Sequence, residues 1–386
     1  MSAGSGPVGV GFIGTGMISS TYLENLTQFP DVHVVILGDL NEAAAKAQAE
    51  RFGVEAWGTP DDVLAHPDVE LVVNLTIPAV HAEVSSKAID AGKHVWSEKP
   101  ISTDRESGRA LLERAEAAGL LVGVAPDTVL GPGVQSARRA IERGDIGQPL
   151  SAQTVMQYIG PDIFHPGPEF LFALGAGPVF DMGPYYVTTL VHVFGSVKNV
   201  AAFGSQSRAQ RTIQVGERRG QTFDVQVPTH VSAIAQFVDG GISQSLFSFD
   251  SPLKRQGVVE ITGTEGTIVI PDPNRFTGEI RIARGPVLGN ASTPDEIKAV
   301  NTAPQTWEDV PVTGVYAERG LGVLDLARAA RTGRRPLASG DLGYHVLDTL
   351  VAIDESVHEG RVVDVESRVE RVPAVAEDYD PFATTL

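Results

Sequence analysis

The fold of this 386-residue chain is decided by one stretch near its start, Val8-Gly-Val-Gly-Phe-Ile-Gly14-Thr-Gly16-Met-Ile-Ser19. The apolar run 8–13 predicts a buried strand, and the run 17–28 predicts the helix that follows it. Between them, Gly14 permits a tight turn and Gly16 lets a phosphate group approach the backbone, while the helix N-terminus supplies free N–H groups. Ser19 takes the third position, where glycine or alanine is usual. The stretch therefore predicts a nucleotide-binding unit of strand, loop and helix.

The rest of the first 125 residues repeat this alternation of strand and helix. Further strands are expected at 32–39, 70–75, 94–97 and 121–125. Helices are expected at 42–52, 80–91 and 104–118, each followed directly by a glycine that can end it. Strands that alternate with helices in this way predict a doubly wound α/β fold with a parallel sheet.

After Pro126 the rhythm changes to longer stretches of β character. One helix is expected at 134–143. Two hairpins are expected, with strands 231–238 and 242–249 around Asp239-Gly-Gly241, and strands 258–261 and 267–270 around Gly263-Thr-Glu-Gly266. Helices at 320–331 and 342–358 close the chain, and 286–304 is expected to be a surface loop. We therefore divide the chain into a Rossmann domain, 1–126, and a substrate-binding α+β domain, 127–386, with a large, mainly antiparallel sheet.

Composition excludes several classes of function. The formal net charge is 30 − 48 = −18, and so acidic a surface repels nucleic-acid phosphates and anionic lipid. The absence of cysteine excludes disulfides, thiolate metal sites and cysteine nucleophiles. The nine histidines show no paired metal-ligand spacing, so no metal is expected. No signal-peptide pattern and no apolar run of about 18 residues occurs, which predicts a soluble, cytoplasmic protein.

Asp39 indicates which dinucleotide the loop would bind. It ends the second expected strand, 39 − 16 = 23 residues after Gly16, where a carboxylate can accept hydrogen bonds from the adenosine ribose hydroxyls. Leu40 and Asn41 follow, so no neighbouring cation is at hand for a 2′-phosphate. This favours NAD over NADP. The alternative is that Asp39 caps the next helix.

The segment His94-Val-Trp-Ser-Glu98-Lys99-Pro100 ends a parallel strand with a charged pair and a proline. Ligands of open α/β sheets gather at the carboxyl ends of the strands, so Lys99 is expected to point into the crevice there. An ammonium group at hydrogen-bond distance polarises a carbonyl toward hydride attack or stabilises an alkoxide. The alternative is an exposed lysine paired with Glu98.

With these residues, the chain resembles the glucose–fructose oxidoreductase/inositol dehydrogenase (Gfo/Idh/MocA) family over nearly its whole length. Further motifs that carry the resemblance are Asn74-Leu-Thr-Ile-Pro78 with His81, Gly144-Asp-Ile-Gly147, Gly177-Pro-Val-Phe-Asp181-Met-Gly183 and Ser356-Val-His-Glu-Gly360. The resemblance implies that Lys99 contacts the reacting oxygen of the substrate and that a cis peptide bond precedes Pro100. It also implies a homodimer or homotetramer formed through the open face of the C-terminal sheet. The residues that it implies for cofactor binding are Gly14, Thr15, Gly16, Met17, Ile18, Asp39, Leu40, Thr76, Ile77, Pro78, His81, Glu98 and Lys99.

In this family a second motif carries an aspartate and, four residues later, usually a histidine. Here the two positions are Asp181 and Tyr185. A phenol can replace the histidine as acid and base where a cation such as Lys99 stabilises the phenolate. The change leaves open whether Tyr185 or Lys99 transfers the proton. Asp181 is expected to orient the substrate or the lysine, with the alternative that it caps a helix before Gly183-Pro184.

Other polar residues near these motifs are weaker candidates. Thr188 and His192 share a helix face with Asp181 and Tyr185; Thr188 is a candidate substrate contact and His192 is expected in the core. Asp127, at the end of the fifth expected strand, and His165, in a proline-rich loop, are further candidate substrate contacts. Tyr186 is expected to pack.

Together these features predict an NAD-dependent oxidoreductase that acts on a sugar, a sugar derivative or a cyclitol. One alternative keeps the fold with a non-sugar substrate of dihydrodiol or biliverdin type. The other is a non-catalytic regulator that binds the dinucleotide.

Overall fold

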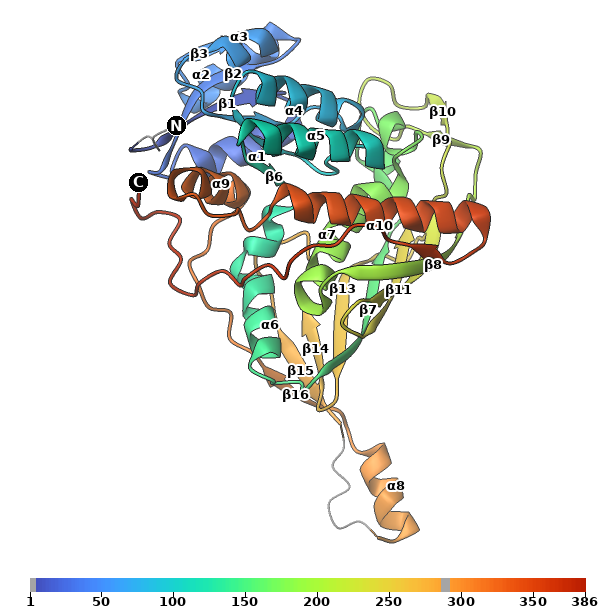
Figure 1. Cartoon of the computed structure of the whole chain (residues 1–386). Helices are drawn as coiled ribbons and strands as arrows, with labels where there is room; N and C mark the ends of the chain where they lie inside the picture. Colours follow the sequence, from blue (N-terminus) through green and yellow to red (C-terminus); the bar gives the residue numbers. More distant parts are fainter. Residues whose placement is uncertain (1–4, 286–291) are drawn as a thin grey trace.

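The computed structural model describes residues 5–285 and 292–386 and contains two large sheets (Figure 1). The first sheet has six strands, all parallel, in the order β3-β2-β1-β4-β5-β6. The order reverses between β1 and β4, which is where open α/β sheets form their ligand crevice. The strands are β1 (Val8–Ile13), β2 (Val32–Gly38), β3 (Ala56–Gly58), β4 (Leu71–Asn74), β5 (His94–Ser97) and β6 (Val122–Val124). The helices between them are α1 (Met17–Leu26), α2 (Glu42–Phe52), α3 (Pro60–Ala65), α4 (His81–Asp90) and α5 (Arg105–Ala118).

This confirms the predicted doubly wound fold, with one unit more than the sequence indicated. The extra unit is β3 with α3, which have three and six residues. Elements this short show no hydrophobic period. The start of α3 nevertheless has a signature, because Thr59 and Asp62 form a reciprocal capping box around Pro60.

The second sheet has nine strands in the order β16-β15-β14-β13-β7-β12-β11-β8-β17. Its neighbours are antiparallel except β7 and β12, which are parallel. Both predicted hairpins are confirmed, as β11 with β12 and as β13 with β14. The strands are β7 (Pro149–Gln157), β8 (Val197–Ser205), β11 (His230–Phe237), β12 (Ile242–Ser248), β13 (Arg255–Gly263), β14 (Thr267–Ile270), β15 (Arg281–Arg284), β16 (Thr306–Asp309) and β17 (Val363–Asp364), with β9 (Gln210–Thr212) and β10 (Thr222–Asp224) as a separate pair.

The helices α6 (Pro132–Glu142), α7 (Gly177–Phe194) and α10 (Gly340–Glu359) lie along one face of this sheet (Figure 1). The other face carries exposed apolar side chains. Phe203, Ile234 and Ile242 share that face by strand register and are 78%, 53% and 49% exposed. The sequence predicted one open face, and this is the face that the helices leave uncovered.

The helix α7 begins earlier than the sequence suggested. Its first residue is Gly177, so Asp181 lies in the second turn and not at the N-cap, and the capping alternative for Asp181 is wrong. Pro184 lies inside the helix and cannot donate an N–H to the carbonyl of Phe180.

The expected loop 286–304 is also corrected in part. Residues 286–291 lie outside the described residues, but α8 (Pro294–Thr302) is a helix that stands apart from the rest of the chain in Figure 1. Its start carries a capping box between Thr293 and Glu296. The sequence Thr293-Pro-Asp-Glu296 contains this capping-box signature, but the polar composition of the segment favoured the prediction of a loop.

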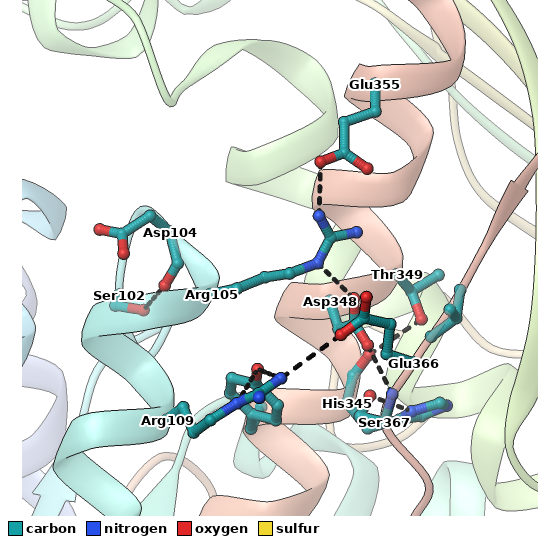
Figure 2. Close-up of polar contacts among 12 residues, drawn as sticks. Ser102, Asp104, Arg105, Arg109, His345, Asp348, Thr349, Glu355, Glu366 and Ser367 are labelled. Carbon is teal, nitrogen blue, oxygen red and sulfur yellow. Dashed lines mark hydrogen bonds and ion pairs between the residues drawn. The ribbon is translucent and has the colours of Figure 1, made fainter.

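Two helices near the C-terminus, α9 (Leu321–Thr332) and α10, pack against the first sheet. In α9, Gly322 packs so closely against Trp96 of β5 that a Cβ there would lie 1.9 Å from the indole ring. Figure 2 shows Arg105 of α5 reaching α10, where its Nε donates to Asp348 Oδ1 at 2.6 Å, with Glu355 as a second partner. Of these two helices, α10 contacts both sheets, through β6 of the first and β8 of the second, and so fixes them against each other. None of the helices in the described ranges combines the length and apolarity needed to cross a bilayer.

Candidate active site

The loop between β1 and α1 has the backbone that a dinucleotide pyrophosphate requires. Gly14 has a φ of +101°, and a Cβ there would lie 2.8 Å from the carbonyl group of Leu75. Gly16, in contrast, faces open space, and as the N-cap of α1 it offers no side chain to the first turn. No side chain caps this turn, so the positive end of the helix is open to an anionic group.

Asp39 follows β2 and is held against this loop. Its Oδ2 accepts hydrogen bonds from Thr15 N at 2.7 Å and Thr15 Oγ1 at 2.9 Å, and its Oδ1 accepts from Asn41 N at 2.9 Å. The N-cap of α2 is Asn41, so Asp39 does not cap that helix. Leu40, beside it, is 93% exposed. The carboxylate and this apolar side chain fit the ribose and adenine end of a dinucleotide without a 2′-phosphate.

A cavity of about 420 Å³ lies next to this loop, at the carboxyl ends of β4 and β5. The structure brings most of the predicted site residues to it. Predicted residues that line the cavity are Ile18, Thr76, Ile77, Pro78, His81, Glu98, Lys99, His165, Asp181 and Tyr185. Met17, 74% exposed, lies on the loop outside the cavity with Gly14, Thr15 and Gly16.

Lys99 joins the two domains inside this cavity. Its Nζ donates to the backbone carbonyl of Asp181 at 2.6 Å and to Asp181 Oδ1 at 2.9 Å, and it lies 5.2 Å from the centre of the Tyr185 ring. Burial acts to lower the pKa of Lys99, but the charge of Asp181, with Tyr185 and Glu98, outweighs burial and raises it. Lys99 is therefore a charged ammonium group at neutral pH. The Lys99–Pro100 bond is cis, as the resemblance implied.

Tyr185 and Tyr186 are neighbours on α7 with different surroundings. Tyr185 lines the cavity and is 6% exposed. Tyr186 is fully buried against Phe247, and its hydroxyl accepts a hydrogen bond from Gly257 N at 2.8 Å. The prediction that Tyr186 packs is confirmed, and Tyr185 is the phenol that faces the cavity.

Glu98 is a buried carboxylate that supports the lysine from the first domain. Its Oε1 accepts from Tyr22 at 2.8 Å, and its Oε2 accepts from the backbone N–H of Lys99 at 3.1 Å. Burial acts to raise the pKa of Glu98, but the charges of Arg319 and Lys99 and the Tyr22 hydrogen bond outweigh burial and lower it. Trp96 completes the network by donating to the Tyr22 hydroxyl at 3.0 Å.

Arg319 is a site residue that the sequence analysis missed. It lines the cavity, is 7% exposed, and places Nη1 3.6 Å from Glu98 Oε1 and 3.9 Å from Asp127 Oδ1. Within the described residues, that Nη1 makes no hydrogen bond. Arg319 comes from the segment before α9, where no motif marks it. It adds a second buried positive charge beside Tyr185.

His81 holds the loops that shape the cavity. Its Nδ1 lies 2.6 Å from Pro100 O and its Nε2 lies 2.9 Å from Thr76 O, and the ring is 1% exposed. The loop after β4 and the Lys99–Pro100 turn are thus tied to one imidazole. Burial lowers the pKa of His81, with the hydrogen bonds to the two carbonyls opposing it. His81 thus acts as a positioning residue for these two loops.

The structure does not bring two of the predicted substrate contacts, Asp127 and Thr188, to the lining of the cavity. Asp127 is fully buried outside the cavity lining, and its Oδ2 accepts from the backbone N–H groups of Gly320 and Gly322 at 2.8 and 3.2 Å. It therefore caps α9 instead of facing the crevice. Thr188 is 2% exposed and lies one turn beyond Tyr185, deeper in the packed part of α7.

The sequence analysis also singled out two histidines, His192 and His165. His192 is buried, as expected, with its Nδ1 3.0 Å from Arg138 Nη1, and burial lowers its pKa to about 3. His165 lines the cavity; its Nδ1 accepts from Gly167 N at 3.0 Å, and its ring packs edge-on against Phe170. Across residues 5–285 and 292–386, no three His, Asp or Glu side chains gather as a metal site.

A Rossmann loop beside a cavity that holds a lysine, a carboxylate and a phenol defines the class of this protein as a dinucleotide-binding oxidoreductase. Residues 8–125 match the model of the Gfo/Idh/MocA oxidoreductase family with an NAD-binding Rossmann fold, and residues 134–269 match the model of its C-terminal domain. The chain belongs to the Gfo/Idh/MocA family of oxidoreductases.

Similar proteins of known name cover almost the whole chain at low identity. D-apiose dehydrogenase of Paraburkholderia graminis is 25% identical over 94% of this chain and 91% of its own length. Inositol 2-dehydrogenase 3 of Saccharopolyspora erythraea is 25% identical over 93% of this chain and 95% of its own. The structure of levoglucosan dehydrogenase with NADH and levoglucosan shares the fold, with a TM-score of 0.77 and 23% identity over 93% of this chain and 99% of that one.

Proposed function

We propose that this chain is an NAD-dependent dehydrogenase that acts on a carbinol carbon of a sugar, a sugar derivative or a cyclitol. The observation that carries the proposal is the contact of Lys99 with Asp181, beside Tyr185, in a cavity that adjoins the dinucleotide loop. The names of the relatives support the substrate class, since they include an apiose dehydrogenase and an inositol dehydrogenase. In this proposal residues 1–126 bind the cofactor and residues 127–386 bind the substrate.

The residues present fit NAD. Gly14 to Ile18 would hold the pyrophosphate at the open end of α1, and Asp39 with Leu40 would hold the adenosine end. Thr76, Ile77 and Pro78, which line the cavity after β4, would contact the nicotinamide end. When bound, NAD takes up the hydride that leaves the carbinol carbon. Asp39 and the absence of a cation at positions 40 and 41 favour NAD over NADP.

Lys99 would bind the reacting oxygen. Its ammonium group donates to Asp181 in this structure and can donate equally to a hydroxyl or carbonyl oxygen of the substrate. Asp181 would keep the lysine charged and aimed into the cavity. Because its pKa is raised, Lys99 is a poor proton acceptor at neutral pH, and this supports another group for the proton transfer.

Tyr185 would be that group. In the oxidation direction the carbinol loses a hydride from carbon and a proton from oxygen, and the phenolate of Tyr185 would accept the proton. In the reverse direction the phenol would return it. Lys99 and Arg319 place positive charge beside this ring, which suits a group that must carry a negative charge for part of the cycle.

Turnover tests the proposal directly. The protein is incubated with NAD and a panel of aldoses, ketoses and cyclitols while the absorbance of reduced cofactor is recorded, and the reverse reaction is followed with NADH. We expect at least one polyhydroxylated substrate to be oxidised. Tight dinucleotide binding without turnover on any alcohol or carbonyl compound would favour the regulator alternative.

We also propose a homodimer or homotetramer formed through the uncovered face of the second sheet. Exposed Phe203, Ile234 and Ile242 on neighbouring strands supply the apolar surface that such an interface buries. Light scattering coupled to size exclusion measures the mass in solution. Phe203→Glu with Ile234→Glu is expected to yield monomers, and unchanged mass in this variant would contradict the proposal.

A further inference from the structure

The cavity lining combines two chemically different sets of side chains. The charged and polar ones are Lys99, Asp181, Tyr185 and Arg319, which we call the polar end. The large apolar ones come from the loop between β7 and α7 and are Phe164, Phe170 and Leu174. We name these three side chains the apolar wall. On that loop, His165 is the polar side chain that lines the cavity beside them.

The three side chains of the apolar wall are exposed, although large apolar side chains are usually buried. Phe164, Phe170 and Leu174 are 61%, 40% and 78% exposed. Large apolar side chains gathered in one concave surface are characteristic of a binding site for an apolar group. Phe164 rests against Tyr158, with ring centres 6.3 Å apart, and is presented to the cavity.

The backbone that carries the wall is held firmly. Arg211, 4% exposed, donates to Asp162 Oδ1 and to Asp250 Oδ1, both at 2.6 Å, and its guanidinium lies 5.0 Å from the ring of Phe172. Phe172 is fully buried between Phe170 and Leu174 in sequence. A buried ion-pair network thus holds the loop that carries the exposed side chains, which favours binding with little rearrangement of the backbone.

A second anchor holds the end of the wall. The backbone N–H of Leu174 donates to Gln226 Oε1 at 3.3 Å, and Gln226 N donates to Phe172 O at 2.9 Å. These hydrogen bonds hold the backbone of Leu174 in place, whereas its exposed side chain has little packing against the protein. An apolar ligand group would bury it without any change of fold.

We infer that the substrate is amphiphilic: a glycoside whose sugar ring is oxidised at the polar end and whose hydrophobic aglycone, an aryl or alkyl group, lies on the apolar wall. This inference rests on the proposed function and makes it narrower. A free sugar has a hydroxyl on almost every carbon, and each buried hydroxyl needs a hydrogen-bond partner. The wall side chains offer none, so they suit the aglycone and not the ring.

Matched glycosides test the inference. For each sugar that supports turnover, kcat/KM is measured on the NAD-loaded enzyme with the methyl β-glycoside and with the phenyl β-glycoside. We expect kcat/KM to be at least about tenfold higher for the phenyl compound, since even one methylene in an apolar pocket changes it by about tenfold or more. Equal values for the two glycosides overturn the inference and leave the proposed function standing. No turnover with any free sugar or glycoside overturns both.

Two variants of the apolar wall test whether this surface causes the preference for the phenyl glycoside. Phe164→Ala and Leu174→Ala are expected to reduce the ratio of phenyl to methyl kcat/KM toward one. The control is Leu253→Ala, because Leu253 is 62% exposed and lies outside the cavity lining, so its ratio stays that of the native protein. If the wall stacks on the sugar ring itself, both glycosides lose kcat/KM equally in the wall variants. That unchanged ratio would contradict the inference.

Discussion

Lys99 at the end of β5 and Asp181 in the second turn of α7 form an ion pair at 2.9 Å, and a second hydrogen bond joins the lysine to the Asp181 carbonyl at 2.6 Å. The two residues lie 82 positions apart: Lys99 follows a strand of the first sheet, and Asp181 lies in a helix that packs on the second sheet. Pro184, one turn later, removes an N–H from α7 at the same turn that the ammonium group approaches. The pair therefore joins the end of the first sheet to α7 within the cavity.

Replacing the lysine removes the positive charge from this point. Lys99→Met is expected to lower kcat by about 10²–10³-fold, as is usual when one preorganised donor to a reacting oxygen is lost. NADH binding, followed by fluorescence titration, should change little because the pyrophosphate loop is untouched. Lys87→Met removes an exposed lysine of α4 and serves as the control. A Lys99→Met protein that keeps more than a tenth of its kcat would show that the lysine is structural.

Tyr185→Phe tests the assignment of the proton transfer. We expect kcat to fall by about 10²–10⁴-fold, with the loss of one limb of the pH–rate profile. The matched control is Tyr186→Phe, since that neighbouring hydroxyl accepts a hydrogen bond from Gly257 and faces away from the cavity. If both variants had the same activity, or if Tyr185→Phe kept the native pH profile, the phenol would not be the acid and base.

Asp39 is expected to decide the choice of cofactor. Asp39→Ala removes the acceptor for ribose hydroxyls and should raise the KM for NAD about 10–100-fold, since hydrogen bonds to a charged group contribute about 1.5–3 kcal/mol. Adding Leu40→Arg supplies a cation for a 2′-phosphate, so the double variant should prefer NADP. Asp39 also holds Thr15, so the melting temperature of each variant checks that the loop remains folded. Unchanged preference for NAD in the double variant would place the ribose elsewhere.

Sequence periodicity predicted the large elements well. The strand β1 and the helix α2 have the predicted bounds, because long apolar or amphipathic runs ended by glycine leave little choice. The short pair β3 and α3 and the isolated α8 were missed. Their capping boxes were present in the sequence, but a few polar residues resemble a loop until the reciprocal hydrogen bonds are seen.

The sequence predicted the residues of the site only where they belong to a recognisable motif. Lys99, Asp181 and Tyr185 lie in motifs and meet in one cavity. Arg319 reaches the cavity from a segment whose position depends on how α9 packs on Trp96, which no local pattern encodes. Asp127 failed for the same reason. The end of a strand predicts exposure to the crevice, yet α9 covers it and takes its carboxylate as a cap.

The stability of the fold is expected to fall in mild acid because of buried histidines. His345 is fully buried in α10; its Nε2 accepts from Val197 N and its Nδ1 contacts Ser367 Oγ (Figure 2 shows the latter), and burial lowers its pKa to about 4. In the unfolded chain a histidine has a pKa of about 6.5. Between these values the unfolded state binds more protons, so the free energy of unfolding decreases as pH falls below about 6.5.

His345→Gln isolates this contribution. For a pKa that changes from about 6.5 to about 4, the loss between pH 7 and pH 5 is about 2 kcal/mol. Urea unfolding at these two pH values should show that much less pH dependence in His345→Gln than in the native protein. His33→Gln replaces an exposed histidine on β2 and should keep the native dependence. Since His192 is also buried, with a pKa lowered to about 3, part of the acid sensitivity should survive in His345→Gln and decrease further in the double variant with His192→Gln. An identical pH dependence in the native protein and in the double variant would mean that carboxylates, and not these imidazoles, destabilise the fold in acid.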